Sequence, residues 1–353
     1  MTNNKFRQLS IFVWIFALPL LGGGSCQSSF VYKQSKIKGV CTVAPNAPID
    51  TAAFQPIRQT NAEWVAVVPY GFCRPNEPHF YFDNSQQWWG ETSQGAAKTI
   101  AMAHQMGLKV MLKPHVWVAQ GTYTGDFTLK TEAEWQIFEQ DFGKYVLRNA
   151  QVADSMHVAL FCIATEMDAF VRQRPQFWRN LIGQVRQIYK GPLTYADNWD
   201  KCHQNPIWAD LDYVGIDAYF PLTNNKKPTP EDLQKGWQPH LQLLKKLAIE
   251  TQKPILFTEF GYRSVEGAAV RPWEYHSEAA TNLQQQADAY EVLFREVWQQ
   301  EWFAGGFVWK WFLHAPTYRR NHEPDPYTPQ GKPAEVVLNP TCFNAPNNYL
   351  TII

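Results

Sequence analysis

The feature that most constrains this chain is an alternation between short apolar segments and longer amphipathic ones, which continues over most of its 353 residues. The apolar segments are rich in Val, Ile, Phe and Tyr and contain few regularly spaced polar residues. That pattern is typical of parallel strands buried on both faces of a sheet. Eight such strands are expected, at residues 37–44, 64–72, 108–118, 157–167, 192–199, 211–220, 254–262 and 303–312.

Helical patterns lie between most of the expected strands. Thr131 and Glu134 have the spacing of a capping box, and Pro175 stands at the start of another helix. Eight strands that alternate with helices predict an α/β fold, a single-domain (β/α)8 TIM barrel. A doubly wound sheet fits less well, because no Gly-rich phosphate loop follows the first strand. The helices are expected at 94–107, 131–150, 175–191, 229–250 and 282–300, with weaker ones at 49–60 and 203–210.

The first 26 residues have the organisation of a signal peptide. Lys5 and Arg7 precede an apolar segment at 9–21, which is too short for a comfortable membrane span, and small residues follow it. The end of this segment, GGGSC, resembles a bacterial lipobox with lipidation of Cys26, although Gly23 stands where Leu is usual. We therefore expect an exported lipoprotein that meets a membrane only through this anchor, at the cell surface or in the periplasm. Without the anchor it would be secreted.

The domain boundaries follow from the expected signal peptide and from the start of the first expected strand. Residues 27–36 are expected to form a short tether, and residues 37–353 form the barrel domain. A Pro- and Asn-rich tail at 313–353 is expected to wrap the barrel. No internal repeat or interdomain linker is visible, and we expect a monomer.

Composition and cysteine usage restrict the ligand. Lys and Arg total 32, equal to Asp and Glu, so no nucleic-acid partner is expected. The 15 Trp, 15 Tyr and 22 Phe exceed what packing usually needs, and flat aromatic rings stack on sugars, which favours a carbohydrate ligand. The cysteines form no CxxC pair and suit no zinc site, so no metal is expected. A disulfide involving Cys202 or Cys342 is left open.

The reactive side chains of a TIM barrel project from the carboxyl ends of its strands. In this sequence those ends carry polar and aromatic residues, whereas the strand starts show nothing comparable. The candidate substrate-binding residues are Lys113, His115, Trp117, Asn198, Trp199, Asp217, Tyr219, Trp309 and Lys310.

Two glutamates, Glu166 and Glu259, end the fourth and seventh expected strands. A carboxylate beside a buried strand is costly unless it is paired and hydrogen-bonded, so either could belong to a structural ion pair. Together they suit glycoside hydrolysis. One carboxyl protonates the leaving oxygen and the other attacks the anomeric carbon, at a separation of about 5–5.5 Å in retaining enzymes. Strand alternation predicts that Thr258, just before Glu259, turns away from the barrel axis.

Five short segments resemble those of a known protein family. KPHVW (113–117), ATEMD (164–168), GIDAYFPL (215–222), FTEFGYRS (257–264) and WKW (309–311) resemble the clan A retaining glycosidases and, within them, glycoside hydrolase family 113. The resemblance covers about residues 37–315 and implies an endo-β-1,4-mannanase that needs no cofactor. It makes Glu166 the acid/base and Glu259 the nucleophile, with Tyr219 hydrogen-bonded to Glu259. Most of clan A has Asn before the acid/base to hold the substrate 2-hydroxyl; here Thr165 stands there, and the group that holds this hydroxyl is left open.

The expected function is therefore a retaining glycoside hydrolase that cleaves a β-linked polysaccharide or oligosaccharide, above all β-1,4-mannan. The nucleophile must stay ionised and the acid protonated, and Lys113, Lys310 and Arg263 are the available cations. Another clan A β-glycanase or an exo-β-mannosidase is the first alternative. A carbohydrate-binding barrel lipoprotein without activity is the second. The only long insertion expected is 70–93, which favours an open cleft.

Overall fold

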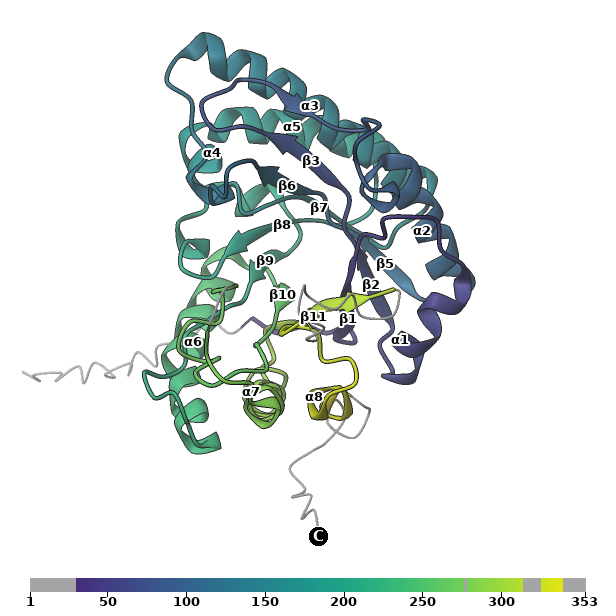
Figure 1. Cartoon of the computed structure of the whole chain (residues 1–353). Helices are drawn as coiled ribbons and strands as arrows, with labels where there is room; N and C mark the ends of the chain where they lie inside the picture. The colour runs from purple at the N-terminus through teal and green to yellow at the C-terminus, as the bar shows by residue number, and fades with distance from the viewer. Residues whose placement is uncertain (1–29, 276–277, 314–324, 339–353) are drawn as a thin grey trace, which may run out of the picture.

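The computed structural model describes residues 30–275, 278–313 and 325–338. Eight parallel strands close into a barrel, with helices around the outside, and the chain colour runs continuously around the ring in Figure 1. This confirms the predicted single-domain (β/α)8 TIM barrel. In ring order the strands are β1 (Ile37–Val43), β2 (Trp64–Val67), β5 (Lys109–Leu112), β7 (Leu160–Thr165), β8 (Leu193–Asn198), β9 (Val214–Asp217), β10 (Ile255–Phe260) and β11 (Phe303–Phe312).

Two of the expected strands are each divided in two. Pro69 and Pro114 follow β2 and β5 at the same height, and proline cannot donate a ladder hydrogen bond. Beyond them the chain continues outside the ring as β3 (Tyr70–Cys73) and β6 (His115–Val118), which pair in parallel. With β4 (Phe80–Tyr81) they make a separate three-stranded sheet. The prolines therefore end the barrel wall on this side and let two chain segments rise above it.

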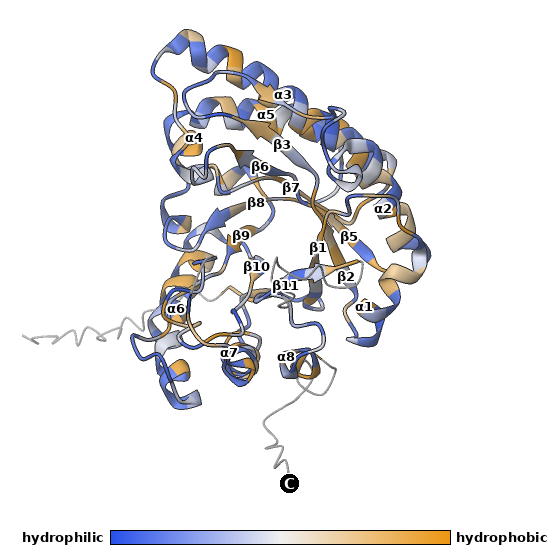
Figure 2. Cartoon of the chain, viewed as in Figure 1, coloured by the Kyte–Doolittle hydropathy of each residue, from blue (hydrophilic) through white to orange (hydrophobic). Residues whose placement is uncertain are grey.

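The helices cover the barrel with their apolar faces inward, and Figure 2 shows apolar residues concentrated in the strands and on the inner sides of the helices. The predicted capping box of α3 is confirmed, since the Thr131 hydroxyl accepts from Glu134 N at 3.2 Å. The weaker helices expected at 49–60 and 203–210 are short turns of helix. The α-helices are α1 (Gln55–Gln59), α2 (Ser93–Gln105), α3 (Glu132–Ser155), α4 (Asp168–Gln173), α5 (Pro175–Ile188), α6 (Pro230–Thr251), α7 (Leu283–Glu296) and α8 (Pro333–Val337).

Apolar side chains fill the barrel interior near the strand starts. A Cβ on Gly39 would lie 2.3 Å from the Phe307 ring, so glycine makes room for this large side chain. Met111, Cys41 and Cys162 belong to the same buried cluster. Side chains thus fill the barrel interior at the strand-start end.

Both described chain ends pack against the barrel. Residues 30–36, within the expected tether, lie on its strand-start end, while α8 packs beside α7 in the expected tail. Cys41, Cys73, Cys162 and Cys202 are buried free thiols. The expected signal peptide, Cys26 and Cys342 lie outside the described residues. Within the described ranges, no helix is both long and apolar enough to cross a membrane.

Candidate active site

A cavity of about 770 Å³ opens at the carboxyl end of the barrel. Both glutamates and all the candidate substrate-binding residues except Lys113 and Lys310 line it: His115, Trp117, Glu166, Asn198, Trp199, Asp217, Tyr219, Glu259 and Trp309. Residues from six different strand ends therefore meet at one place, as the TIM-barrel prediction requires.

Glu259 is held by three side chains at the bottom of this cavity. Its Oε1 accepts from the Lys113 ammonium and lies 3.2 Å from His115 Nε2, while its Oε2 accepts from the Tyr219 hydroxyl at 2.8 Å. The carboxylate is only 4% exposed. Its position and rotamer are fixed before any ligand arrives.

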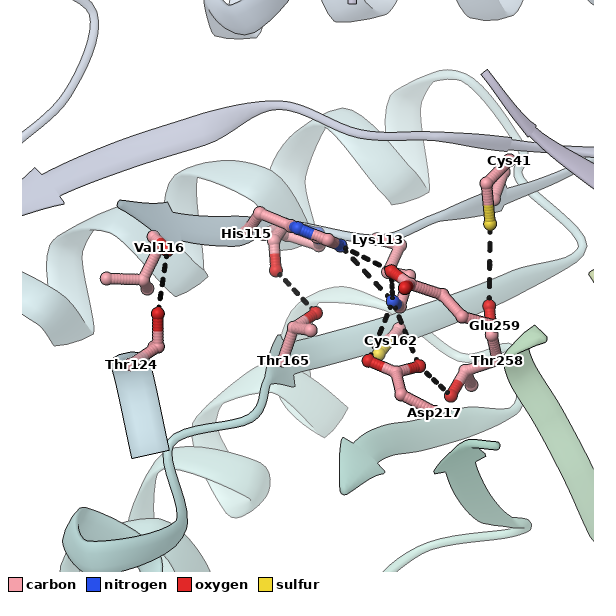
Figure 3. A network of polar contacts seen from close by, with 12 residues as sticks. Cys41, Lys113, His115, Val116, Thr124, Cys162, Thr165, Asp217, Thr258 and Glu259 are labelled. Atoms are coloured by element: carbon pink, nitrogen blue, oxygen red, sulfur yellow. Dashed lines mark hydrogen bonds and ion pairs between the residues drawn. The ribbon is translucent and has the colours of Figure 1, made fainter. Parts of the chain in front are cut away.

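Lys113 lies beneath Glu259 and is completely buried. Its ammonium is also 3.2 Å from both carboxylate oxygens of Asp217, so it stands between two carboxylates, as Figure 3 shows. The Thr258 hydroxyl donates to Asp217 at 2.7 Å. The prediction that Thr258 turns away from the barrel axis is therefore wrong. The register between β9 and β10 shifts between Phe257 and Glu259, and such irregularities re-aim neighbouring side chains.

The electrostatics of this cluster keep Glu259 ionised. Burial alone would raise its pKa, but Lys113 and the hydrogen bond from His115 lower the pKa of Glu259 to about 2. Burial and the charge of Lys113 lower the pKa of His115 to about 4, so the ring is neutral near pH 7. Its Nε2 lies 3.2 Å from both Glu259 Oε1 and the Lys113 ammonium. Burial and the nearby Glu259 raise the pKa of Asp217 to about 7, against the opposing effect of Lys113.

Glu166 is held quite differently. It follows β7 with a φ of 51°, and its backbone N–H donates to the Ala196 carbonyl at 2.8 Å. Its carboxyl group is partly exposed to the cavity and makes no hydrogen bond with any residue of the described ranges. Burial and the negative charges of Asp217 and Glu259 raise the pKa of Glu166 well above its usual value. These effects favour the protonated form of Glu166, and its carboxyl group faces the cavity.

The residue before Glu166 is turned aside. The Thr165 hydroxyl donates to the Pro114 carbonyl at 3.1 Å, which uses its proton for the barrel wall. Because that proton is used, Thr165 can meet a ligand only as a hydrogen-bond acceptor. Thr165 and His115 both line the cavity, and His115 also lies beside Glu259.

Beyond Glu166, a cluster of hydrogen-bonded polar side chains joins two loops. The Tyr123 hydroxyl donates to Asp168 at 3.2 Å and accepts from the Asn198 amide. Asp197, behind them, accepts from the Asn205 amide at 2.8 Å, and burial and a hydrogen bond with Asp168 raise its pKa well above the usual value. Hydrogen bonds between loops therefore shape this side of the cavity.

Stacked aromatic pairs form the walls. Trp309 stacks on His115 with ring centroids 5.8 Å apart, and Trp199 stacks on Trp273 at 5.3 Å. Tyr275 stacks on Tyr327 at 6.2 Å. The candidate residues of the sequence analysis did not include five of the lining aromatics: Tyr70, Tyr123, Trp273, Tyr275 and Tyr327. The dense RPWEY segment at 271–275 was the available signal for two of them.

Two candidate residues do not line the cavity. Lys113 is buried below Glu259, and the Lys310 ammonium pairs with Asp325 at 3.1 Å. Arg263 is also buried, 3.7 Å from Glu274, away from Glu259. Of the three cations that the sequence offered for ionising Glu259, the structure places Lys113 there.

The expectation about loops also needs correction. The insertion at 70–93 contributes only Tyr70 to the lining, and the exposed Trp88 lies off the cavity. A second long connection, 261–282, follows β10 and supplies Trp273 and Tyr275.

Among the described residues, no group of three or more His, Cys, Asp or Glu side chains is placed so that it could hold a metal ion. Instead, the cavity offers one carboxylate kept charged and one carboxyl kept protonated. Such a pair can supply a nucleophile and a general acid to one bond.

Comparisons with known proteins agree with this chemistry. The family described as Glycoside Hydrolase Family 113 matches residues 48–332. A β-mannanase of that family from Alicyclobacillus acidocaldarius, solved with the ligand ManMIm, is 25% identical, with a TM-score of 0.75 over 86% of this chain and 96% of its own. A β-1,4-mannanase of the same family is 26% identical, with a TM-score of 0.74 over 86% and 98%.

A more distant likeness shows the fold alone. A β-glucuronidase from Faecalibacterium prausnitzii is 16% identical, with a TM-score of 0.56 over 87% of this chain and 48% of its own. Comparison of the sequence with curated proteins gave no match.

Proposed function

Because the chain belongs to glycoside hydrolase family 113 and is a glycoside hydrolase, we propose that it cleaves β-1,4-mannan with retention of anomeric configuration. The observation that carries the proposal is the opposed protonation of Glu166 and Glu259, which share one cavity. A retaining hydrolase needs these two states in its resting form.

In the first step Glu259 Oε attacks the anomeric carbon and forms a glycosyl ester. The bond from that carbon to the leaving oxygen breaks, and Glu166 gives its proton to the leaving oxygen. Lys113, His115 and Tyr219 fix the attacking carboxylate, so little reorganisation is needed at this moment.

In the second step the same residues exchange protonation states. Once Glu259 is an ester it carries no charge, and one of the charges that raise the pKa of Glu166 disappears. Glu166 then accepts a proton from water, whose oxygen attacks the anomeric carbon and releases Glu259. Lys113 keeps a partner throughout, because Asp217 remains beside it.

The choice of mannan rests on similarity and on the cavity walls. Two solved structures of family 113 that are similar to this chain are described as β-mannanases. Stacked aromatic pairs on both sides of the glutamates suit the flat faces of a chain of pyranose rings.

The test is hydrolysis of mannan, glucan and xylan oligosaccharides by the wild type, Glu166→Ala and Glu259→Ala, followed by NMR of the anomer first released. Mannan should be the best substrate, both variants should lose at least about 10³-fold in kcat/KM, and the β-anomer should appear first. Glu250→Ala, an exposed α6 residue, is the control. Initial release of the α-anomer, or full activity in either variant, contradicts the proposal.

We further propose that the protein is exported and anchored through a lipid on Cys26, which the GGGSC segment supports. Mass spectrometry of the N-terminal peptide from the membrane fraction should show an acylated Cys26. An unmodified Cys26 in a protein that fractionates with the medium would contradict the anchor while leaving the hydrolase proposal intact.

A further inference from the structure

The strand-start end of the barrel, opposite the cavity, carries the described beginning of the chain. Tyr32 N donates to the Glu301 carbonyl at 2.7 Å, and the Tyr32 ring packs edge-on against Tyr213 at 6.3 Å. Lys36 donates to the carbonyls of Gln300 and Phe303 at 2.7 and 2.9 Å. Residues 30–36 are therefore bound to this end of the barrel and do not swing as a free tether.

The contacts of residues 30–36 determine which end of the barrel a lipid on Cys26 would hold near the membrane. Phe30 packs against the core. It is four positions after Cys26, a stretch that spans at most about 14 Å when fully extended. A lipid on Cys26 would thus hold the strand-start end close to the membrane and leave the cavity at the far end.

The same end has the chemistry of a membrane-facing surface. We define the strand-start face as the lysines, acidic residues and half-buried aromatics at the beginnings of the barrel strands and on segment 30–36. Its lysines outnumber its acidic residues, and the Lys109 ammonium lies 5.5 Å above the Trp64 ring. The face consists of Lys33, Lys36, Lys38, Lys109, Lys190 and Lys253, with Glu63, Asp212 and Glu301 and with Tyr32, Trp64 and Tyr213.

Lysines beside Trp and Tyr suit the boundary between water and lipid. The aromatic rings occupy the headgroup level, and lysines are attracted to anionic lipids. The opposite rim shows no comparable excess of lysines, because Asp126, Asp168 and Asp200 line the cavity together with Arg172 and Lys201.

We propose that the strand-start face rests on an anionic phospholipid surface, so that the anchored enzyme points its cavity away from the membrane toward soluble polysaccharide. This inference rests on the proposed anchor at Cys26, and it adds an orientation and a lipid preference to it. The barrel is held at two points, by the lipid and by the face, and cannot turn its cavity toward the bilayer.

The test uses the lipidated chain purified from membranes and reconstituted into vesicles of phosphatidylcholine with 30% phosphatidylglycerol, or of phosphatidylcholine alone. Lysine acetylation is then read by mass spectrometry. Lys33, Lys109 and Lys190 should be protected only on the anionic vesicles, whereas Lys98, Lys130 and Lys235, which are exposed on other faces, should react equally in all samples. A rise to 0.5 M NaCl should remove the protection.

The triple variant Lys33→Glu, Lys109→Glu, Lys190→Glu should lose the protection of Lys38, one of the three face lysines that it retains, while Lys98→Glu, Lys130→Glu, Lys235→Glu should keep it. Each lysine is expected to contribute about fivefold to association with anionic lipid. Equal reactivity on both vesicle types overturns the inference. So does protection in detergent without vesicles, which would assign the face to a second copy of the chain.

The outcomes also separate this inference from the proposals it rests on. A chain that lacks the lipid on Cys26 contradicts the anchor and the orientation together. Hydrolysis of mannan oligosaccharides by the same detergent-solubilised samples tests the enzymatic proposal on its own, and the triple variant should retain wild-type activity there.

Discussion

The two glutamates of the cavity show how one fold can keep two identical side chains in opposite states. Glu259 lies on β10, is almost wholly buried, and is bound by Lys113, His115 and Tyr219. Glu166 follows β7 and has no hydrogen-bond partner for its carboxyl group in the described part of the chain. Both are buried enough to favour the neutral acid, and only Glu259 has a cation beside it.

The comparison places the decisive difference in one buried lysine. Burial raises the pKa of both carboxyls, and the charge of Lys113 lowers both. Of the two glutamates, however, only Glu259 is hydrogen-bonded to the Lys113 ammonium. The negative charge thus retained on Glu259 is one of the causes that keep Glu166 protonated. Lys113 therefore acts on Glu166 both directly, where it lowers the pKa, and through the charge that it retains on Glu259. Removing Lys113 should make the two glutamates more alike.

The largest expected effect is that of Lys113→Met, which removes the buried cation but keeps an unbranched side chain. The pKa of Glu259 should rise, so the acid limb of the kcat/KM profile should move to higher pH. Breaking a buried ion pair costs about 3–5 kcal/mol, so kcat/KM at neutral pH should fall at least about 10²-fold and the melting temperature should drop.

Lys36→Met is the control, because this lysine is also hydrogen-bonded through its ammonium but is only partly buried and lies at the other end of the barrel. It should lower stability without moving the acid limb. If Lys113→Met lost stability but kept the wild-type acid limb, Lys113 would be a structural residue only.

The next effect in size concerns the hydroxyl that holds the second oxygen of Glu259. Tyr219→Phe removes a hydrogen bond to a charged group, which contributes about 1.5–3 kcal/mol. We expect kcat to fall about tenfold to 100-fold with KM little changed, since the ligand-facing ring remains. Steady-state kinetics on a mannan oligosaccharide measures this split.

Tyr262→Phe is the control for that substitution. Tyr262 is buried nearby, and among the described residues its hydroxyl has no hydrogen-bond partner. Loss of the Tyr262 hydroxyl should leave both kinetic constants unchanged. A larger KM effect than kcat effect in Tyr219→Phe would show that Tyr219 binds sugar and does not position Glu259.

The two halves of the site also differ in how far the sequence could predict them. The Glu259 half depends on strand ends, and the apolar strands at 108–118, 211–220 and 254–262 already placed Lys113, His115, Asp217, Tyr219 and Glu259 at one rim. What the sequence could not predict was how deep each of these side chains lies in the barrel. Lys113 and His115 are two positions apart, and only the break at Pro114 puts one beneath Glu259 and the other beside it.

The Glu166 half depends on loops, and loop packing leaves little trace in a sequence. Tyr123 reaches Asn198 across 75 positions of the chain, and Trp273 meets Trp199 across the mouth of the cavity. Neither hydrophobic periodicity nor a helix-capping residue predicts such contacts between loops. The same limit explains the error at Thr258, because a register shift between strands is a property of the pair of strands and not of either one.

That loop-built half should matter most for long substrates. Trp273 is 46% exposed and stacks on Trp199. We expect Trp273→Ala to lower kcat/KM about threefold to tenfold on mannohexaose, in line with the value of one aromatic contact. It should have almost no effect on an aryl β-mannoside with a small leaving group. The comparison of these two substrates is the measurement.

Trp88→Ala provides the reference for Trp273→Ala, because Trp88 is 52% exposed but does not line the cavity. It should change neither rate. Equal losses on both substrates in Trp273→Ala would mean that the Trp199–Trp273 pair supports the fold of the site and does not contact the leaving-group side of the substrate.

The smallest expected effect tests the protonation of Glu166 directly. Asp168 lines the cavity two positions after Glu166, and its negative charge is one of the causes that raise the pKa of Glu166. Asp168→Asn removes that charge but keeps an oxygen that can accept from Tyr123. The pKa of Glu166 should fall, so its acid form is lost sooner as pH rises, and the alkaline limb of kcat/KM should move down by about one pH unit or less. Asp141→Asn, a similar change on α3 away from the cavity, should leave both limbs in place. A shift of the acid limb instead would mean that Asp168 acts on Glu259, and the division of the site into two electrostatic halves would have to be abandoned.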